Sequence, residues 1–230
     1  MALDENIFLR YMEDGIPVLR LYSWEAPSFT YGVSQNPENQ INTSRCALEG
    51  IQIAKRITGG GILFHGNEIT YSLACSKDDL GEDKNIFVSY RKACAFLISF
   101  YKSLGLDPIF ALESDDFKDK CAAHELCSAS REKYDILING RKIGGNAQKR
   151  RRQAVFQHGS IPLSIDWNLV RRYAPFLSGS ISAEVTSLSD ELKNLPERPG
   201  LEERIIDVFR SEFSADFIEE GAAVYETAMA

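Results

Sequence analysis

The chain has 230 residues, of which 44% are hydrophobic and 26% are charged, and this balance predicts a folded domain and excludes a disordered segment. The formal net charge of −7 excludes a general nucleic-acid binder, because binding to a phosphate backbone requires a basic surface. No apolar run approaches the roughly 18 residues of a membrane span, and the acidic start Met1–Glu5 is unlike a signal peptide, so we expect a cytoplasmic protein without a membrane segment.

The first third of the chain alternates short predicted helices and strands around a glycine-rich turn. Helices are indicated by apolar residues three and four apart, and strands by short apolar runs between turn residues. In chain order we predict a helix over 3–12, a strand over 18–22, a short helix over 45–49, a strand over 52–56, and strands over 62–64 and 69–74.

The rest of the chain carries the strongest helical signal and the strongest turn signal. Apolar residues fall on one face throughout 86–104, which predicts one long helix. Asn139-Gly140 is typical of a two-residue β-hairpin loop. The remaining predictions are strands over 134–138, 141–143, 154–157 and 161–165, and helices over 167–173 and 200–213.

These elements predict an α+β fold with mixed, largely antiparallel sheets flanked by helices. Hairpin turns stand where a parallel sheet would need helical crossovers. We find no repeat and no linker-like stretch, so we expect residues 1–230 to form one catalytic domain without a separate accessory domain.

The cysteines and histidines indicate neither a disulfide framework nor a metal site. There are five cysteines without a C-x-x-C pair and three widely spaced histidines. We therefore expect reduced thiols and no bound metal.

Three glycines, Gly59, Gly60 and Gly61, stand between two predicted strands and are followed by His65. Without Cβ atoms, such a backbone can adopt positive φ and let a ligand lie against its amides. The segment is neither a Walker A loop nor a dinucleotide fingerprint. From the residues alone, a tight turn and a ligand loop remain equally open.

Two further polar clusters interrupt the predicted strands. Lys142 follows the hairpin and precedes a glycine pair, Gly144 and Gly145. A lone lysine is normally a solvated charge, but one beside glycines can donate to a carbonyl or phosphate. The other cluster is Gln157-His158-Gly159-Ser160.

These blocks occur in a fixed order and together resemble a known family. They are Arg56–Gly61 with Phe64-His65 and Thr70-Tyr71-Ser72, then Gly140–Ile143 with Asn146-Ala147-Gln148, then Gln157–Ser160. The set resembles the catalytic domain of lipoate-protein ligases and cysteine-dependent octanoyltransferases, over about residues 1–195. Biotin ligases share that fold, but their Gly-Arg-Gly-Arg loop is absent here.

The resemblance implies protein lipoylation, in which a lipoyl or octanoyl group is attached to a lysine of an apo lipoyl domain. It implies that the glycine loop and His65 line the acyl tunnel and that Lys142 is catalytic, contacting the reacting carboxyl group. The substrate-binding residues that it implies are Arg56, Thr58, Gly59, Gly60, Gly61, His65, Tyr71, Gly144, Gly145, Asn146, Ala147, His158 and Gly159.

Two routes of acyl activation remain open. A ligase makes an adenylate from lipoate with ATP and Mg²⁺, whereas a transferase takes octanoate from acyl carrier protein onto a cysteine without ATP. Cys127 resembles that nucleophile in position, and its polar, partly cationic neighbours favour a thiolate. Cys121 is the nearest competitor. The glycine block looks closer to the ligases, and Glu68–Ser72 and the His158 block look closer to the transferases.

The partners implied are lipoyl domains of 2-oxoacid dehydrogenases, the glycine-cleavage H protein and acyl carrier protein. The basic run Lys149–Arg152 is most simply a solvated turn between strands, with docking of an acidic carrier as the alternative. A catalytically silent protein that binds lipoyl domains or supports a ligase is the rival function. The glycine loop, the lysine and the thiol together favour an enzyme.

Overall fold

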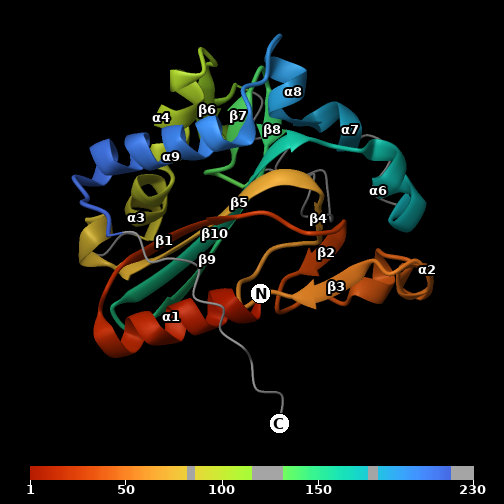
Figure 1. The fold of residues 1–230 in the computed structure, drawn as a ribbon, viewed down its shortest axis with the longest axis horizontal. Helices are drawn as coiled ribbons and strands as arrows, with labels where there is room; N and C mark the ends of the chain where they lie inside the picture. Colours follow the sequence, from red (N-terminus) through yellow and green to blue (C-terminus); the bar gives the residue numbers. More distant parts are fainter. Residues whose placement is uncertain (82–85, 116–131, 176–180, 219–230) are drawn as a thin grey trace.

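The computed structural model describes residues 1–81, 86–115, 132–175 and 181–218, and its centre is a four-stranded antiparallel sheet (Figure 1). The strand order in this sheet is β1-β5-β10-β9. Its longest strands are β5 and β10, whose residues are buried along almost their whole length, as expected for strands covered on both faces. The bounds are β1 Val18–Tyr22, β5 Asn67–Ser76, β9 Gly145–Arg151 and β10 Ala154–Ser164.

Two smaller sheets flank the central one, and each contains one parallel pair. One has the order β3-β2-β4, with β2 parallel to β3 and antiparallel to β4. The other has the order β11-β8-β7-β6, with β11 parallel to β8. The bounds are β2 Ser28–Tyr31, β3 Gln52–Lys55, β4 Leu63–His65, β6 Pro108–Phe110, β7 Ile136–Ile138, β8 Arg141–Ile143 and β11 Val185–Thr186.

Helices cover both faces of the central sheet. In Figure 1, α1 runs along the lower side of the sheet, and α3, α4 and α9 lie above it. The helices are α1 Ala2–Asp14, α2 Thr43–Leu48, α3 Ile86–Ala93, α4 Ala95–Ser103, α6 Trp167–Tyr173, α7 Ile181–Glu184, α8 Leu188–Glu191 and α9 Arg198–Phe213. Short 3₁₀ turns are η1 Pro37–Asn39, η2 Asp78–Leu80 and η3 Ala111–Glu113.

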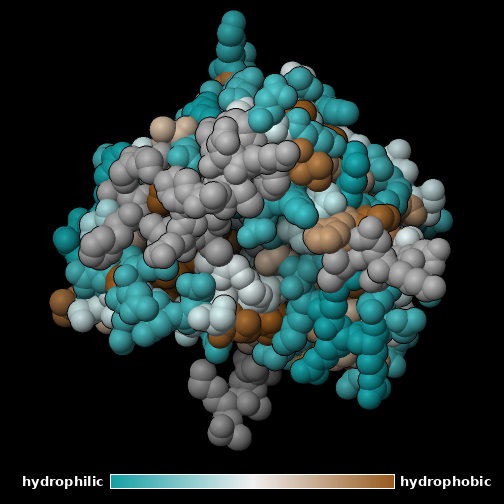
Figure 2. Space-filling model, turned by 180° about the vertical axis from the view of Figure 1, so that it is seen from behind, coloured by the Kyte–Doolittle hydropathy of each residue, from teal (hydrophilic) through white to brown (hydrophobic). Residues whose placement is uncertain are grey.

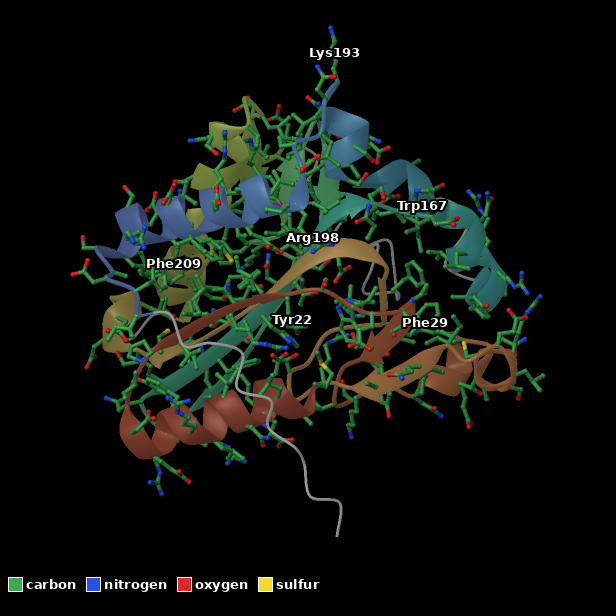
Figure 3. All side chains as sticks on the ribbon, viewed as in Figure 1. Tyr22, Phe29, Trp167, Lys193, Arg198 and Phe209 are labelled. Atoms are coloured by element: carbon green, nitrogen blue, oxygen red, sulfur yellow. The ribbon has the colours of Figure 1, made fainter. Side chains whose placement is uncertain are left out.

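The core is divided among the two faces of the central sheet and the side sheet of β2. The largest cluster lies between the central sheet and the α4–α9 pair, where Phe96 packs edge-on against both Tyr71 and Phe209. On the other face, Phe8 of α1 packs against Phe156. A third cluster surrounds Phe29, on the opposite side of the molecule from Phe209 (Figure 3). Burying each large aromatic side chain contributes roughly 1.5–3 kcal/mol.

The predicted α+β class with mixed, largely antiparallel sheets is confirmed. The short helix predicted over 45–49 is α2, which begins two residues earlier, at Thr43, because the Asn42 side chain caps it by accepting a hydrogen bond from the Arg45 amide. The 139–140 hairpin joins β7 to β8. Strand 154–164 is one continuous element where two were predicted.

Two predictions about secondary structure were wrong. The single helix over 86–104 is two helices that meet at Cys94, because Gln157 Nε2 donates to the Ala93 carbonyl and so competes with the helical ladder. The basic run beginning at Lys149 is not a turn: its first three residues complete β9, and Arg152 alone turns, with φ 46°.

Hydrophilic residues cover much of the described surface on the face shown in Figure 2, and hydrophobic ones appear there in separate small patches. Among the described residues, no helix combines the length and the apolar character that crossing a bilayer requires.

Candidate active site

The glycine loop, the hairpin of Lys142 and the strand of His158 meet around one cavity. Its walls come from all three sheets: β5, β9 and β10 of the central sheet, β4 of one side sheet and β8 of the other. The sequence-predicted residues that line it are Arg56, Gly60, Gly61, His65, Lys142, Gly145, Asn146, Ala147, His158 and Gly159. Thr58, Gly59, Tyr71 and Gly144 are not among the lining residues, but Thr58 is hydrogen-bonded to His158 and Tyr71 to Asn146.

Lys142 is held in the cavity wall by a buried ion pair. Its Nζ lies 2.8 Å from Oδ2 of Asp135, and both residues are less than 10% exposed. A buried ammonium needs such a partner, because removal from water without one costs several kcal/mol. The pair fixes the ammonium at the cavity, where it can donate to a developing negative charge.

Asp135 was missed by the sequence reasoning, although the hairpin contained the signal. The hairpin register places Leu137 opposite Lys142, so Asp135 is a diagonal neighbour on the same face. Pairing the two strands outward from the predicted Asn139-Gly140 loop would have indicated that Asp135 lies close to Lys142.

The side chain of Arg56 holds the conformation of the glycine loop. Its guanidinium donates to the carbonyl of Gly61 at 2.5 Å and of Gly59 at 3.3 Å. Gly60 has φ 92°, and its carbonyl fills the place where a Cβ of Gly32 would lie. The loop is therefore packed closely against the backbone at Gly32, and its residues Gly60 and Gly61 line the cavity.

His65 is buried in the wall, and the protein engages both of its ring nitrogens. Nε2 lies 2.6 Å from the hydroxyl of Thr30, and Nδ1 lies 2.7 Å from Oε1 of Glu68. Burial opposes ionisation of Glu68, but the charge of His65 and three hydrogen bonds outweigh it and lower the pKa of this carboxyl. Because Glu68 is then an acceptor, Nδ1 carries a proton. His65 thus shapes the cavity and is not free to act as a base.

Glu68 collects hydrogen bonds from three elements around the cavity. Besides His65, the hydroxyl of Thr70 donates to Oε1 at 2.6 Å and that of Ser160 to Oε2 at 3.0 Å. The Trp24 ring stacks on His65 with 4.1 Å between centroids, and its Nε1 donates to Thr70. The sequence offered one sign of this network, the alternation of polar and apolar residues from Glu68 to Ser72 in a strand buried on both faces.

His158 is tied to α1 on the opposite side of the cavity. Its Nε2 lies 2.7 Å from the Thr58 hydroxyl, and Nδ1 lies 3.5 Å from Oδ2 of Asp4. Burial lowers the pKa of His158, and Asp4 only partly compensates. Burial raises the pKa of Asp4, but the hydrogen bonds from His158 and Tyr22 outweigh it and the net shift is downward. Asp4 was also missed, because a carboxylate at the start of a helix reads as an ordinary capping charge.

The backbone conformation and surroundings of Gly144 leave no space for a side chain. It has φ 69°, and a Cβ there would lie 1.9 Å from the carbonyl oxygen of Ser160. The close approach lets β8 pass directly into β9, so that Lys142 and Asn146 face the same cavity.

The candidate nucleophile Cys127, its competitor Cys121 and His124 lie outside the described residues. The described cysteines, Cys46, Cys75 and Cys94, are all buried and reduced. Burial raises the pKa of Cys75 and of Cys94 to about 12, which leaves both as inert thiols. The described residues also contain no group of three metal-ligating side chains.

Comparison with known sequences agrees with this architecture. The profile of the lipoyl protein ligase A/B catalytic domain matches residues 1–210. The octanoyltransferase LipM of Clostridioides difficile is 30% identical over 98% of this chain and 86% of its own length. The octanoyltransferase LipM of Bacillus cereus is 36% identical over 72% of this chain, a match that spans 61% of that relative.

Solved structures share the fold. A lipoate-protein ligase A bound with ATP superposes with a TM-score of 0.77 at 23% identity, over 95% of this chain and 81% of that one. A putative lipoate protein ligase from T. acidophilum with bound lipoic acid gives the same values. The chain therefore belongs to the lipoyl protein ligase A/B catalytic domain family, and it is an enzyme of the group that comprises octanoyltransferases and lipoate-protein ligases.

Proposed function

We propose that the protein transfers an octanoyl group from the thioester of an acyl carrier protein to the acceptor lysine of an apo lipoyl domain or H protein. The observation that carries the proposal is the ammonium of Lys142, held by Asp135 in a cavity that is otherwise walled by glycines and uncharged side chains on the β9 side. The names of the two sequence relatives described above, both octanoyltransferases, support the octanoyl donor.

The proposed reaction has two acyl-transfer steps. In the first, the thiolate of Cys127 attacks the donor carbonyl, the C–S bond of the donor breaks, and the carrier leaves as its thiolate. In the second, the neutral acceptor amine attacks the Cys127 thioester, the Cys127 thiolate leaves, and the nitrogen releases one proton to the solvent as the amide forms. Both steps pass through an oxyanion, and we assign to Lys142 the role of donating a hydrogen bond to it.

Asn146 and Gly145 provide the neighbouring polar wall. The Asn146 side-chain oxygen accepts from Tyr71, so its amide nitrogen is left to face the cavity as a donor. An amide and an ammonium in the lining of one cavity suit a carbonyl that gains negative charge, and neither group requires a nucleotide.

The test is intact-mass spectrometry of the purified protein after incubation with octanoyl-acyl carrier protein in the absence of ATP. We expect one octanoyl adduct, which Cys127→Ala abolishes and the matched control Cys121→Ala retains. Modification of a lipoyl domain only with free lipoate and MgATP would instead establish the ligase route. Modification under neither condition would favour the silent binding protein.

A further inference from the structure

The edge strand β9 carries a basic row that starts at the cavity. Side chains alternate along a strand, so Ala147, Lys149 and Arg151 lie on one face. Ala147 lines the cavity, and Arg151 lies roughly 13 Å farther along the strand at about 3.3 Å per residue. Arg152 follows in the turn. The row therefore leads outward from the site along the edge of the central sheet.

Arg150 does not belong to this row. It faces the helical side of the sheet, where its Nε donates to Gln148 at 3.1 Å and its guanidinium contacts Ser89 of α3. The alternation thus separates one arginine that fastens β9 to α3 from the three outward cations Lys149, Arg151 and Arg152, which we call the basic row.

The charges of the basic row do not contribute ion pairs to the described fold. Some arginines elsewhere on the described surface pair with carboxylates, as Arg91 does with Glu113 and Arg172 with Glu49. Within the described part of the chain, the three cations of the basic row form no ion pair. Three adjacent unpaired cations raise the local potential of a protein whose net charge is −7, and such a patch attracts an anionic partner.

Distance decides which anionic partner fits. The acceptor is a lysine side chain, which is short, so the backbone of a lipoyl domain must lie directly at the mouth of the cavity. An acyl carrier protein presents its acyl group on a phosphopantetheine arm, which spans roughly as far as five extended residues, about 18 Å. With the thioester at Lys142, the phosphate and the acidic body of such a carrier would reach the outer end of the basic row.

We propose that the basic row of Lys149, Arg151 and Arg152 is the docking surface for the acidic acyl carrier protein that donates the octanoyl group. The inference rests on the proposed thioester route. It assigns donor and acceptor to different parts of the surface: the donor protein binds along the edge of β9, and the acceptor domain binds directly over the cavity.

The experiment compares the triple variant Lys149→Glu, Arg151→Glu, Arg152→Glu with the wild type in steady-state octanoyl transfer. We expect KM for octanoyl-acyl carrier protein to rise roughly tenfold at low salt, with the difference shrinking as salt is added. We expect kcat, and KM for the lipoyl-domain acceptor, to stay unchanged. Octanoyl-pantetheine, which lacks the protein, should serve both enzymes equally.

The matched control is the triple variant Lys102→Glu, Arg171→Glu, Lys193→Glu, which changes net charge equally at exposed sites away from β9. Lys193, for example, projects from the top of the view in Figure 3, far from β9 in the lower half of Figure 1. An equal rise in KM for the control would overturn the proposal, because it would be an effect of net charge. A rise confined to the acceptor would overturn it in favour of lipoyl-domain docking.

Binding of fluorescent holo-acyl carrier protein, measured by anisotropy, separates this inference from the proposed function. If the wild type turns over the carrier substrate but the basic-row variant binds the carrier equally well, the inference fails alone. If the wild type neither binds nor uses the carrier, both fail.

Discussion

Tyr71 and Asn146 are hydrogen-bonded to each other across an intervening strand, with 2.7 Å between the Tyr71 hydroxyl and Asn146 Oδ1. Tyr71 is on β5 and Asn146 on β9, and both stand in register with Gly159 of β10 between them. A Cβ at Gly159 would lie 2.2 Å from the Asn146 oxygen and 2.6 Å from the tyrosine ring. The bond can form because Gly159 has no side chain. It fixes the orientation of the Asn146 amide relative to the cavity.

Replacing Tyr71 with Phe removes this bond and leaves buried polar atoms of Asn146 and Gln157 without their partner. We expect a loss of about 1–3 kcal/mol in the free energy of unfolding, measured by urea denaturation. We also expect kcat/KM to fall, because Asn146 can then rotate its amide away from the cavity. Tyr101→Phe is the control, since Tyr101 is equally buried in the same core cluster away from the cavity. Normal kcat/KM in Tyr71→Phe would show that Asn146 orientation does not matter for transfer.

Replacing Lys142 with Met should both destabilise the fold and stop turnover, and the two effects can be separated. Removing one member of a buried ion pair costs about 3–5 kcal/mol, because Asp135 keeps an uncompensated charge. The double variant Lys142→Met, Asp135→Asn should regain most of that stability. Its kcat should remain at least roughly a hundredfold low, as expected when one oxyanion donor is lost.

The neighbouring ion pair provides the control for that experiment. Arg141 points to the other face of β8 and lies 2.8 Å from Glu191, outside the cavity lining. Arg141→Met should cost less stability and leave kcat unchanged. A double variant of Lys142 and Asp135 with wild-type turnover would remove Lys142 from catalysis and leave the pair a purely structural role.

Native alkylation should separate the cysteines by burial. Cys46, Cys75 and Cys94 are buried, and burial raises the thiol pKa in each, so a thiolate rarely forms there. We expect iodoacetamide at neutral pH to label Cys127 first and these three only after unfolding, as read by peptide mass spectrometry. Rapid native labelling of Cys94 would contradict the buried position that the fold gives it.

The parts of the fold that follow from local chemistry were predictable, and the parts that depend on long-range contacts were not. The Asn139-Gly140 hairpin was predicted and is confirmed, and it is set by neighbouring residues, as is the start of α2 at Asn42. The break at Cys94 depends on Gln157, 63 residues away, and could not be read from the helical pattern. Strand β9 was missed because Gly145–Arg151 is polar and charged, and it lacks the alternation of apolar and polar residues that indicates a half-buried strand.

The candidate site shows the same division. Its motif residues were found because glycines, a lysine and histidines interrupt apolar strands. The acidic partners Asp4, Glu68 and Asp135 were missed, since a carboxylate in sequence looks like solvated charge until the fold brings it to a buried cation or histidine.

Stability should fall as the pH drops from about 7.5 to 5.5, and His158 should be a main cause. Its pKa is lowered in the folded protein, so the unfolded chain binds the proton more tightly. The contribution is full above the unfolded pKa of about 6.5 and is lost as the pH falls through that value toward the folded one. Urea titrations should show a smaller slope of unfolding free energy against pH in His158→Gln. An unchanged slope would mean that His158 is readily protonated in the folded protein.

Gly140, in the hairpin loop, and Gly144, directly after β8, test whether the fold around Lys142 depends on close backbone contact. Gly140 and Gly144 have similar left-handed backbones, with φ 74° and 69°, so alanine at either position carries a conformational cost of roughly 1–2 kcal/mol. Only Gly144 adds a clash, because its Cβ would lie 1.9 Å from the Ser160 carbonyl, whereas nothing lies within 4 Å of a Cβ at Gly140. Gly140→Ala should therefore fold and transfer acyl groups with a slightly reduced melting temperature. Gly144→Ala should be much less stable, and what folds should have a raised KM, because the backbone at Gly144 must move away from β10 and take the start of β9, with Asn146, along with it. Equal effects of the two substitutions would show that β9 can shift without disturbing the cavity.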